Sequence, residues 1–295
     1  MHMRLLLLGV ENALGQALVR QGEEAGFHFA QPPEPVEGWT AERLSAVFEM
    51  HRPQVVINLA YYYDWFQAGK LDESVFPAQH QMIAGLTTLC LNYDCILLQP
   101  SSYRVFDGMR TSAYSEQDEV APLDARGRAL WNIEQLVRGQ LEQHVLLRFG
   151  WILDESRDSL MGRFLQRLAS GEEFFLADDR RGNPTPVDDA ARVLLAVIKQ
   201  LDCNAPLWGT YHYGGQEATT PLLVAEALYD GSLQFSQPAI AQLKAIAHSA
   251  CDDASAEPQH GVLTTRKITN AFGIKPRAWR TGLEELLRRY YANDL

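Results

Sequence analysis

Apolar residues in the first half of the chain alternate between short continuous runs and stretches where they recur every three or four positions. The short runs suit buried strands and cover Arg4–Gly9, Phe27–Ala30, Val55–Leu59, Ile96–Gln99 and Val145–Phe149. The helical spacing falls around Leu14–Val19 and Leu44–Phe48 and over Ser74–Asn92 and Asp124–Gln140. This alternation predicts an α/β fold, in which a doubly wound parallel sheet carries helices on both faces.

The pattern is looser after residue 150. Helices are expected over Leu160–Ala169, Val187–Leu201, Pro221–Asp230 and Gly282–Tyr291, and strands over Phe174–Leu176 and Thr210–Tyr213. The polar stretch Asp252–His260 predicts a surface loop. We therefore expect a core over residues 1–150 and a smaller C-terminal α/β lobe over residues 151–295, from which some segments return to the core.

The composition is that of a globular protein and excludes several classes of function. The formal charge of −11 over 295 residues argues against wrapping nucleic acid, which needs a basic face. No stretch approaches the ~20 apolar residues that span a bilayer, and Leu5–Leu8 is too short for a signal core, so we expect a cytoplasmic protein. Because Cys90, Cys95, Cys203 and Cys251 form no CxxC pair and no metal-ligand spacing with His, we expect free thiols and no metal.

A glycine turn follows the first predicted strand. Gly9 and Gly15 match the outer positions of a GxxGxxG motif, and Asn12 replaces the middle glycine. In a Rossmann-like nucleotide-binding core this turn holds a pyrophosphate over the helix N-terminus; alternatively, two glycines make a tight turn and nothing more. Asn tolerates a left-handed backbone, but its side chain would crowd the phosphate. The second strand runs into Gln31–Pro33 without a carboxylate for a ribose, and the nearest basic residue, Arg20, is on the preceding helix.

Several segments in order resemble the extended short-chain dehydrogenase/reductases, and most of all the dTDP-4-dehydrorhamnose reductase (sugar-nucleotide-binding) family. They are Leu5–Gly9 with Gly15, His51–Ala60, Pro100–Gly108, Glu116 with Ala121–Leu123, Leu147–Trp151, Asp178–Thr185 and Gly209–His212. The resemblance implies a Rossmann fold that binds NADP or NAD and a nucleotide sugar. It places cofactor contacts at Gly9, Asn12, Leu14, Gly15, Ala60 and Ser101, and substrate contacts at Tyr62, Arg148, Trp151 and Arg181.

The catalytic positions depart from the family. The family uses a Tyr as proton donor and a Lys four residues later, which places both on one helix face. Here the resemblance puts Arg126 and Leu130 at those positions, and none of the eleven tyrosines is followed by Lys at that spacing. An always-charged Arg is no ordinary proton donor, and Leu cannot hydrogen-bond a ribose. Ser102 keeps the family's Ser/Thr position, where capping of the strand end is the simpler interpretation, and Tyr103 replaces the family's Asp.

Other residues have both a functional and a structural interpretation. The aromatic segment Tyr61–Phe66 follows the third strand and suits stacking on a ligand, filling of the cofactor space, or a protein interface. For Arg180 and Arg181 we expect a solvated charged loop, whereas Arg148 suits an internal role. No GxSxG motif is present, and the histidines do not cluster with an acid and a nucleophile, which excludes a triad hydrolase.

Three hypotheses stay open. The chain is a non-catalytic or altered member of the family, a pseudoenzyme that binds a nucleotide, a sugar nucleotide or a protein partner; a regulatory subunit of methionine adenosyltransferase that resembles these reductases is a precedent. Alternatively, it is an active NAD(P)-dependent oxidoreductase with Tyr103 or Tyr62 as proton donor. The third hypothesis is a pure interaction protein whose cleft is filled by aromatics. The sequence leaves a homo-oligomer open.

Overall fold

The predicted strands of the first half form one parallel sheet. The computed structural model describes residues 3–62, 73–201, 207–236 and 242–292. Within them the main sheet has the order β2-β1-β3-β4-β5-β9, and every neighbouring pair is parallel. The strands are β1 (Leu5–Leu8), β2 (Phe29–Ala30), β3 (Val55–Asn58), β4 (Ile96–Ser102), β5 (His144–Phe149) and β9 (Gly209–Tyr213). The doubly wound α/β fold is therefore confirmed.

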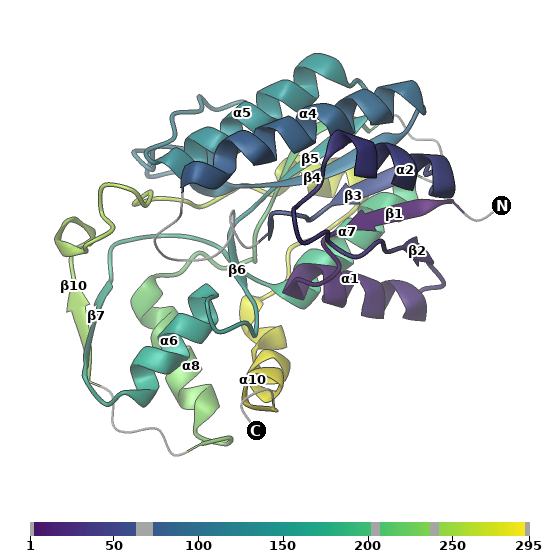
Figure 1. Ribbon diagram of the computed structural model, residues 1–295. Coiled ribbons are helices and arrows are strands. Elements are labelled where there is room, and N and C mark those ends of the chain that lie inside the picture. Colours follow the sequence, from purple (N-terminus) through teal and green to yellow (C-terminus); the bar gives the residue numbers. More distant parts are fainter. Residues whose placement is uncertain (1–2, 63–72, 202–206, 237–241, 293–295) are drawn as a thin grey trace.

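Helices cover both faces of this sheet (Figure 1). One face carries α2 (Ala41–His51), α4 (Phe76–Asn92) and α5 (Ala125–Gln140), and the other carries α1 (Ala13–Glu24) and α7 (Val187–Leu201). The residues of β1, β3 and β5 are buried along their whole length, as a parallel sheet enclosed on both faces requires.

The later segments build a smaller lobe below the main sheet in Figure 1. Its strands form two parallel pairs, β6 (Trp151–Leu153) with β8 (Pro184–Pro186) and β7 (Glu173–Ala177) with β10 (Gln242–Ile246). Its helices are α6 (Leu160–Ala169), α8 (Pro221–Ser232) and α10 (Leu283–Ala292), while α9 (Arg266–Phe272) packs against β9. Short 3₁₀ turns lie at Glu73–Val75, Tyr103–Val105, His248–Ala250 and Trp279–Gly282.

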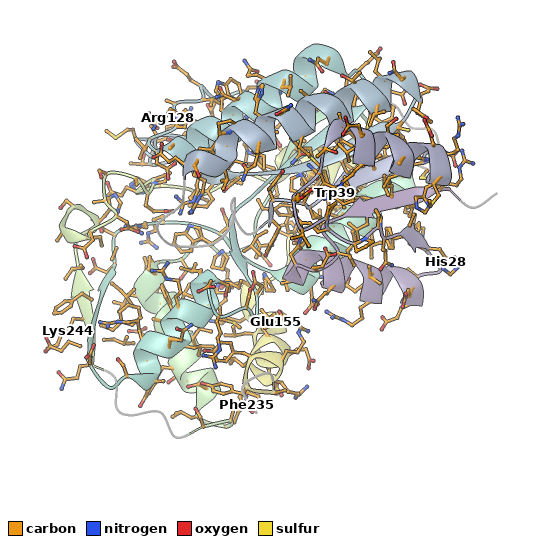
Figure 2. The ribbon with its side chains drawn as sticks, in the orientation of Figure 1. His28, Trp39, Arg128, Glu155, Phe235 and Lys244 are labelled. Carbon is orange, nitrogen blue, oxygen red and sulfur yellow. The ribbon has the colours of Figure 1, made fainter. Side chains whose placement is uncertain are left out.

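Ion pairs join the smaller lobe to the main layers. Arg289 of α10 pairs with Glu155, which Figure 2 labels beside that helix, at 3.0 Å and with Asp188 of α7 at 2.7 Å. Asp188 also pairs with Arg20 of α1 at 2.5 Å. Arg20, the basic residue closest to the second strand in sequence, is thus engaged by Asp188, which ties α1, α7 and α10 together.

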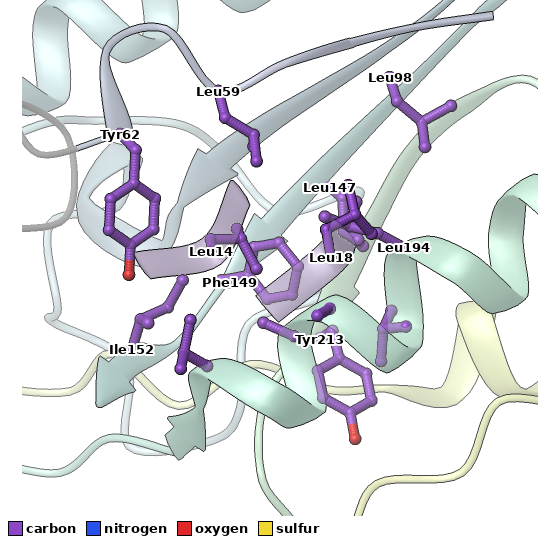
Figure 3. Close-up of a cluster of buried hydrophobic side chains, with 14 of the residues drawn as sticks. Leu14, Leu18, Leu59, Tyr62, Leu98, Leu147, Phe149, Ile152, Leu194 and Tyr213 are labelled. Atoms are coloured by element: carbon purple, nitrogen blue, oxygen red, sulfur yellow. The ribbon is translucent and has the colours of Figure 1, made fainter. Parts of the chain in front are cut away.

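The apolar core connects the glycine turn to the centre of the sheet. Leu14 and Leu18 of α1 lie with Phe149 of β5 and Leu194 of α7 in one buried cluster, shown in Figure 3. Since α7 and β9 complete the main layers, parts of the chain after residue 150 belong to them. The division into a core and a cap at residue 150 stays a prediction.

Local differences from the predictions have physical causes. The short strands of the smaller lobe, β6, β8 and β10, and helix α9 were not predicted, because three to seven residues carry too little periodicity. The surface-loop prediction for Asp252–His260 is wrong in part, since Glu257 is only 6% exposed. That carboxylate is buried through partners distant in sequence, which no local pattern can show.

Gly9 is required by a backbone contact, which gives a test of the fold. It has φ +82°, and a Cβ there would lie 2.4 Å from the carbonyl carbon of Leu59, whereas Gly26 has φ +81° with no atom within 4 Å of its Cβ position. We expect Gly9→Ala to lower the free energy of unfolding by about 1–3 kcal/mol more than Gly26→Ala, because both share the backbone strain and only the first adds overlap. Urea denaturation measures this. Equal losses would show that the approach of the turn to Leu59 is not tight.

Candidate functional site

The glycine turn connects the end of β1 to α1 and lies against the end of β3. A Cβ on Gly15 would lie 2.4 Å from the carbonyl oxygen of Gly9, so both glycines are needed for close packing. The carboxylate of Glu11 accepts a hydrogen bond from the amide of Glu34 at 2.9 Å, which attaches the loop after β2 to this turn. The turn therefore has the compact strand-to-helix geometry expected of a phosphate-binding loop.

Asn12 closes this turn with its side chain. Its Oδ1 accepts from the amide of Gly15 at 2.8 Å, and its Nδ2 donates to the carbonyls of Gly9 at 2.5 Å and Leu59 at 2.9 Å. Asn12 has φ −83°, so it does not use the left-handed backbone that asparagine tolerates, and Gly9 takes a positive φ instead. The amide of Gly15 is occupied, while those of Ala13 and Leu14 precede the first intrahelical bond and are the ones a phosphate would meet.

Arg126, Leu130 and Glu134 follow one another at intervals of four residues on the buried face of α5. Asp124 caps the helix by accepting from the amide of Gly127 at 2.7 Å. Leu130 is 1% exposed in the core, where it has no polar atom to offer. Arg126 is also buried, and burial, followed by the nearby charge of Arg104, lowers its pKa.

Tyr103 and Arg104 share one carboxylate. The Tyr103 hydroxyl donates to Glu257, and Arg104 forms ion pairs with Glu257 and, at 3.5 Å, with Asp124. Burial and then the Glu257 charge raise the pKa of Tyr103 above its ordinary value. A tyrosine with such a raised pKa gives up its proton reluctantly. Ser102 caps the following turn by accepting from the amide of Arg104 at 3.4 Å, the contact that its simpler interpretation predicts.

The centre of the site is a buried ion pair between α5 and β5. Arg148 donates to both oxygens of Glu134, from Nε at 2.8 Å and from Nη2 at 2.6 Å, and both residues are at most 1% exposed. Ser101 donates to Glu134 at 2.6 Å, and Arg148 Nη1 lies 3.2 Å from Nε2 of His212. Arg138 completes the network at 3.0 Å from Glu134. Arg148 therefore has an internal role, and the Ser101 hydroxyl points toward α5.

Tyr62 is buried between the two lobes. Its hydroxyl donates to Asp154 at 2.8 Å, and its ring belongs to the buried cluster that includes Leu59 and Ile152, labelled in Figure 3. Burial raises the pKa of the Asp154 carboxyl, although hydrogen bonds from Ser156 and Tyr62 act against the shift. Residues 63–66 of the predicted aromatic segment lie outside the described residues, so its role as a whole stays a prediction.

The arginines of the loop after β7 differ from each other. Arg180 is 8% exposed and donates to both oxygens of Asp253, at 2.9 and 2.5 Å, and to His248 Nδ1 at 3.0 Å. The solvated loop predicted for Arg180 is wrong, whereas Arg181 is exposed as predicted. Trp151 is buried, and its indole lies so close to Gly182 that no Cβ would fit there.

The remaining predicted positions are near the strand ends. The amide of Ala60 donates to the side chain of Asn58 at 3.3 Å.

Cys90 and Cys95 are buried free thiols, and burial raises the pKa of Cys95 to about 11, while Cys203 lies outside the described residues. The described residues include no group of three metal-binding side chains. No helix among them is both long and apolar enough to cross a bilayer.

Sequence reasoning missed the acidic partners Glu134, Asp154, Asp253 and Glu257. Glu134 had a usable signal, because it continues the four-residue stripe of Arg126 and Leu130 on a predicted helix. The other three had no local signal, because their partners are distant in the sequence. The separation is 73 residues for Asp253, 92 for Asp154 and 154 for Glu257.

The family model and the similar curated proteins point to the same family. The family described as RmlD substrate binding domain matches residues 3–292. A dTDP-4-dehydrorhamnose reductase of Aggregatibacter actinomycetemcomitans is 24% identical over 98% of this chain and 99% of its own. The spore coat polysaccharide biosynthesis protein SpsK of Bacillus subtilis is 25% identical, with 97% of each chain covered.

Solved structures share the fold. A dTDP-4-dehydrorhamnose reductase of Clostridium acetobutylicum superposes with a TM-score of 0.82 at 19% identity, over 97% of this chain and 99% of the other. The Bacillus anthracis reductase, solved in complex with NADP, gives 0.80 at 18% identity, over 98% and 100%. At this level of identity the likeness establishes the fold alone.

The buried ion pair yields a quantitative prediction. Glu134→Gln would leave Arg148 buried with its charge uncompensated, and we expect a loss of about 3–5 kcal/mol in the free energy of unfolding. Glu226→Gln, at an exposed position of α8, serves as the control and should change it by less than about 0.5 kcal/mol. The double variant Glu134→Met/Arg148→Met should lose less than Glu134→Gln alone. Equal stability of the two Gln variants in urea denaturation would contradict the assignment.

Proposed function

Because this chain belongs to the RmlD substrate binding domain family, we propose that it is a non-catalytic member, which keeps a nucleotide-binding turn and has lost the reduction step. The identity of the residues on the buried face of α5 carries this proposal. Arg126 and Leu130 take the positions where the resemblance implies the Tyr and Lys of the proton-transfer pair. Neither side chain can do that chemistry: Leu130 has no polar atom, and an arginine keeps its proton at neutral pH.

An active oxidoreductase would need Tyr103 or Tyr62 as its proton donor, and both side chains are hydrogen-bonded within the protein. Tyr103 donates to Glu257 and Tyr62 donates to Asp154, and both hydroxyls are buried. A general acid must reach the developing alkoxide and must have a pKa near the working pH. The raised pKa of Tyr103 moves it away from that range. These contacts favour the non-catalytic proposal over an active oxidoreductase with a different donor.

A dinucleotide fits this chain at one end only. The glycine turn and the amides of Ala13 and Leu14 suit a pyrophosphate at the start of α1. At the reacting end, Leu130 offers nothing to a ribose, and Ser101 and Arg148 are turned to Glu134. NADP, which the Bacillus anthracis structure contains, is thus a candidate for binding through its phosphates, and we derive no hydride transfer from it. A sugar nucleotide is held by the same phosphate chemistry, and a protein partner is the alternative ligand.

The first test measures turnover. Purified protein is incubated with NADPH and dTDP-4-dehydrorhamnose, the substrate implied by the names of its relatives, and oxidation is followed by absorbance. We expect no rate above the protein-free background. Steady NADPH consumption would contradict the proposal, and the variants Tyr62→Phe and Tyr103→Phe would then identify the donor.

The second test concerns Asn12 and nucleotide binding. Asn12→Gly frees the amide of Gly15 and removes a side chain from the turn, so we expect NADPH affinity in calorimetry to rise about tenfold, as one added charge-assisted hydrogen bond would give. Thr40→Gly, which removes the equivalent cap from α2, is the control and should leave the affinity unchanged. If neither the natural protein nor Asn12→Gly binds NADPH or NADH at millimolar concentration, nucleotide binding is excluded and the search moves to protein partners.

A further inference from the structure

A groove lies along the outer edge of β9, the last strand of the main sheet. Two adjoining hollows of about 520 and 430 Å³ share Ser115, Glu116 and Lys267. The first is completed by Arg266 and Asn270 of α9, and the second by Arg138 of α5 and Thr210 of β9. We call this surface the β9-edge groove. Its size is within the range of small-molecule sites.

The groove is locally positive in an acidic protein. Arg138, Arg266 and Lys267 line it, and Glu116 is the one carboxylate in the lining; Arg138 also pairs with the buried Glu134 at 3.0 Å, while the whole chain carries −11. Lys267 lines both hollows, with Arg266 in the first and Arg138 in the second, and cations in a hollow with low-dielectric walls attract a small anion. The chemistry of the lining therefore selects for a negatively charged ligand.

Two of these cations are held in place. Lys267 donates to the carbonyl of Thr210 at 2.6 Å, with its ammonium 4.4 Å from the centre of the Tyr211 ring. Arg138 donates to Thr210 Oγ1 at 2.7 Å and lies over the ring of Trp131 at 5.2 Å. Each keeps further N–H groups beyond these bonds, since an ammonium has three donors and a guanidinium five. Fixed donors bind an anion at a lower cost in side-chain entropy.

The lone carboxylate restricts the ligand further. One oxygen of Glu116 accepts from the amide of His212 at 2.9 Å, which fixes the side chain at the strand edge. A carboxylate next to a phosphate is unfavourable unless the ligand also brings hydroxyl donors. Glu116 and Asn270 supply acceptors and donors that a polyol uses, and Ser115, whose hydroxyl donates to Asp118 at 2.9 Å, can accept. The combination suits a molecule that carries both a phosphate and sugar hydroxyls.

The β9-edge groove is separate from the glycine turn. Thr210 is the second residue of β9 and Arg138 lies in the last turn of α5, whereas the turn at Gly9 follows the last residue of β1. Because the strands are parallel, the start of β9 and the end of β1 lie at opposite ends of the sheet, and the strand order places β9 at the edge far from β1. A ligand there leaves the nucleotide turn accessible.

We propose that the β9-edge groove binds a phosphorylated sugar, whose phosphate meets Lys267, Arg138 and Arg266 and whose hydroxyls meet Glu116 and Ser115. This inference goes beyond the proposed function and does not depend on it.

The test is a calorimetric titration of the full chain with glucose 1-phosphate, inorganic phosphate and glucose. Lys267→Met removes a cation from the groove, and Lys244→Met, on β10 of the smaller lobe (Figure 2), makes the same charge change elsewhere. We expect glucose 1-phosphate to bind more tightly than either fragment. Lys267→Met should weaken its binding at least about tenfold, and Lys244→Met less than twofold. Arg266→Gln, at an exposed position, gives a second measurement if Lys267→Met fails to fold.

Four results would overturn the proposal. The first is that glucose 1-phosphate does not bind, and the second is that Lys267→Met or Arg266→Gln binds it as tightly as the natural protein does. The third is that inorganic phosphate or glucose binds as tightly as the sugar phosphate. The fourth is that NADPH displaces glucose 1-phosphate. The last result would place the sugar phosphate at the glycine turn. Failure of NADPH to bind at all would affect only the nucleotide proposal.

Discussion

The ion pair between Glu134 and Arg148 fixes α5 against the sheet, and the rest of the site depends on it. Both side chains are withdrawn from water, which is costly unless every charge has partners. Here the two oxygens of Glu134 receive hydrogen bonds from Arg148, Ser101 and Arg138, which come from three different elements. The pair therefore joins α5, β4 and β5 in one arrangement, and His212 extends it to β9.

The anchoring of Glu134 determines which side chains of α5 lie near the carboxyl ends of the strands. With Glu134 anchored, Leu130 points into the core one turn earlier and Arg126 lies a further turn toward the helix start, beside Arg104. Ser101 and Arg148, two polar groups to which the family resemblance assigns ligand contacts, donate to Glu134 within the protein. Under the proposed function, a fold shared with reductases thus presents a face of α5 that has no group suited to proton transfer. The glycine turn keeps its compact geometry, so we propose that nucleotide binding and chemistry are separable in this chain.

Much of the fold could be predicted from the sequence, because buried parallel strands are continuous apolar runs and their helices have clear periodicity. Helices such as Leu160–Ala169 and Val187–Leu201 begin and end where the pattern places them. The site was less accessible. The role of Asn12 depends on the carbonyl of Leu59, and burial of Arg180 depends on Asp253, which are contacts between distant segments. Polar residues that are buried through such partners look identical in sequence to solvated ones, as the stretch Asp252–His260 illustrates.

The central claim is that no hydride reaches a nucleotide sugar on this chain, and isotope transfer in a single turnover tests it most directly. Protein in excess is mixed with dTDP-4-dehydrorhamnose and NADPH deuterated at both C4 positions, and the sugar is analysed by mass spectrometry. Our account predicts no deuterium at the former carbonyl carbon, even after long incubation, because the face of α5 offers no proton donor. Transfer of one deuterium per chain would contradict it, since a single event needs no efficient catalyst and would reveal a complete reaction site.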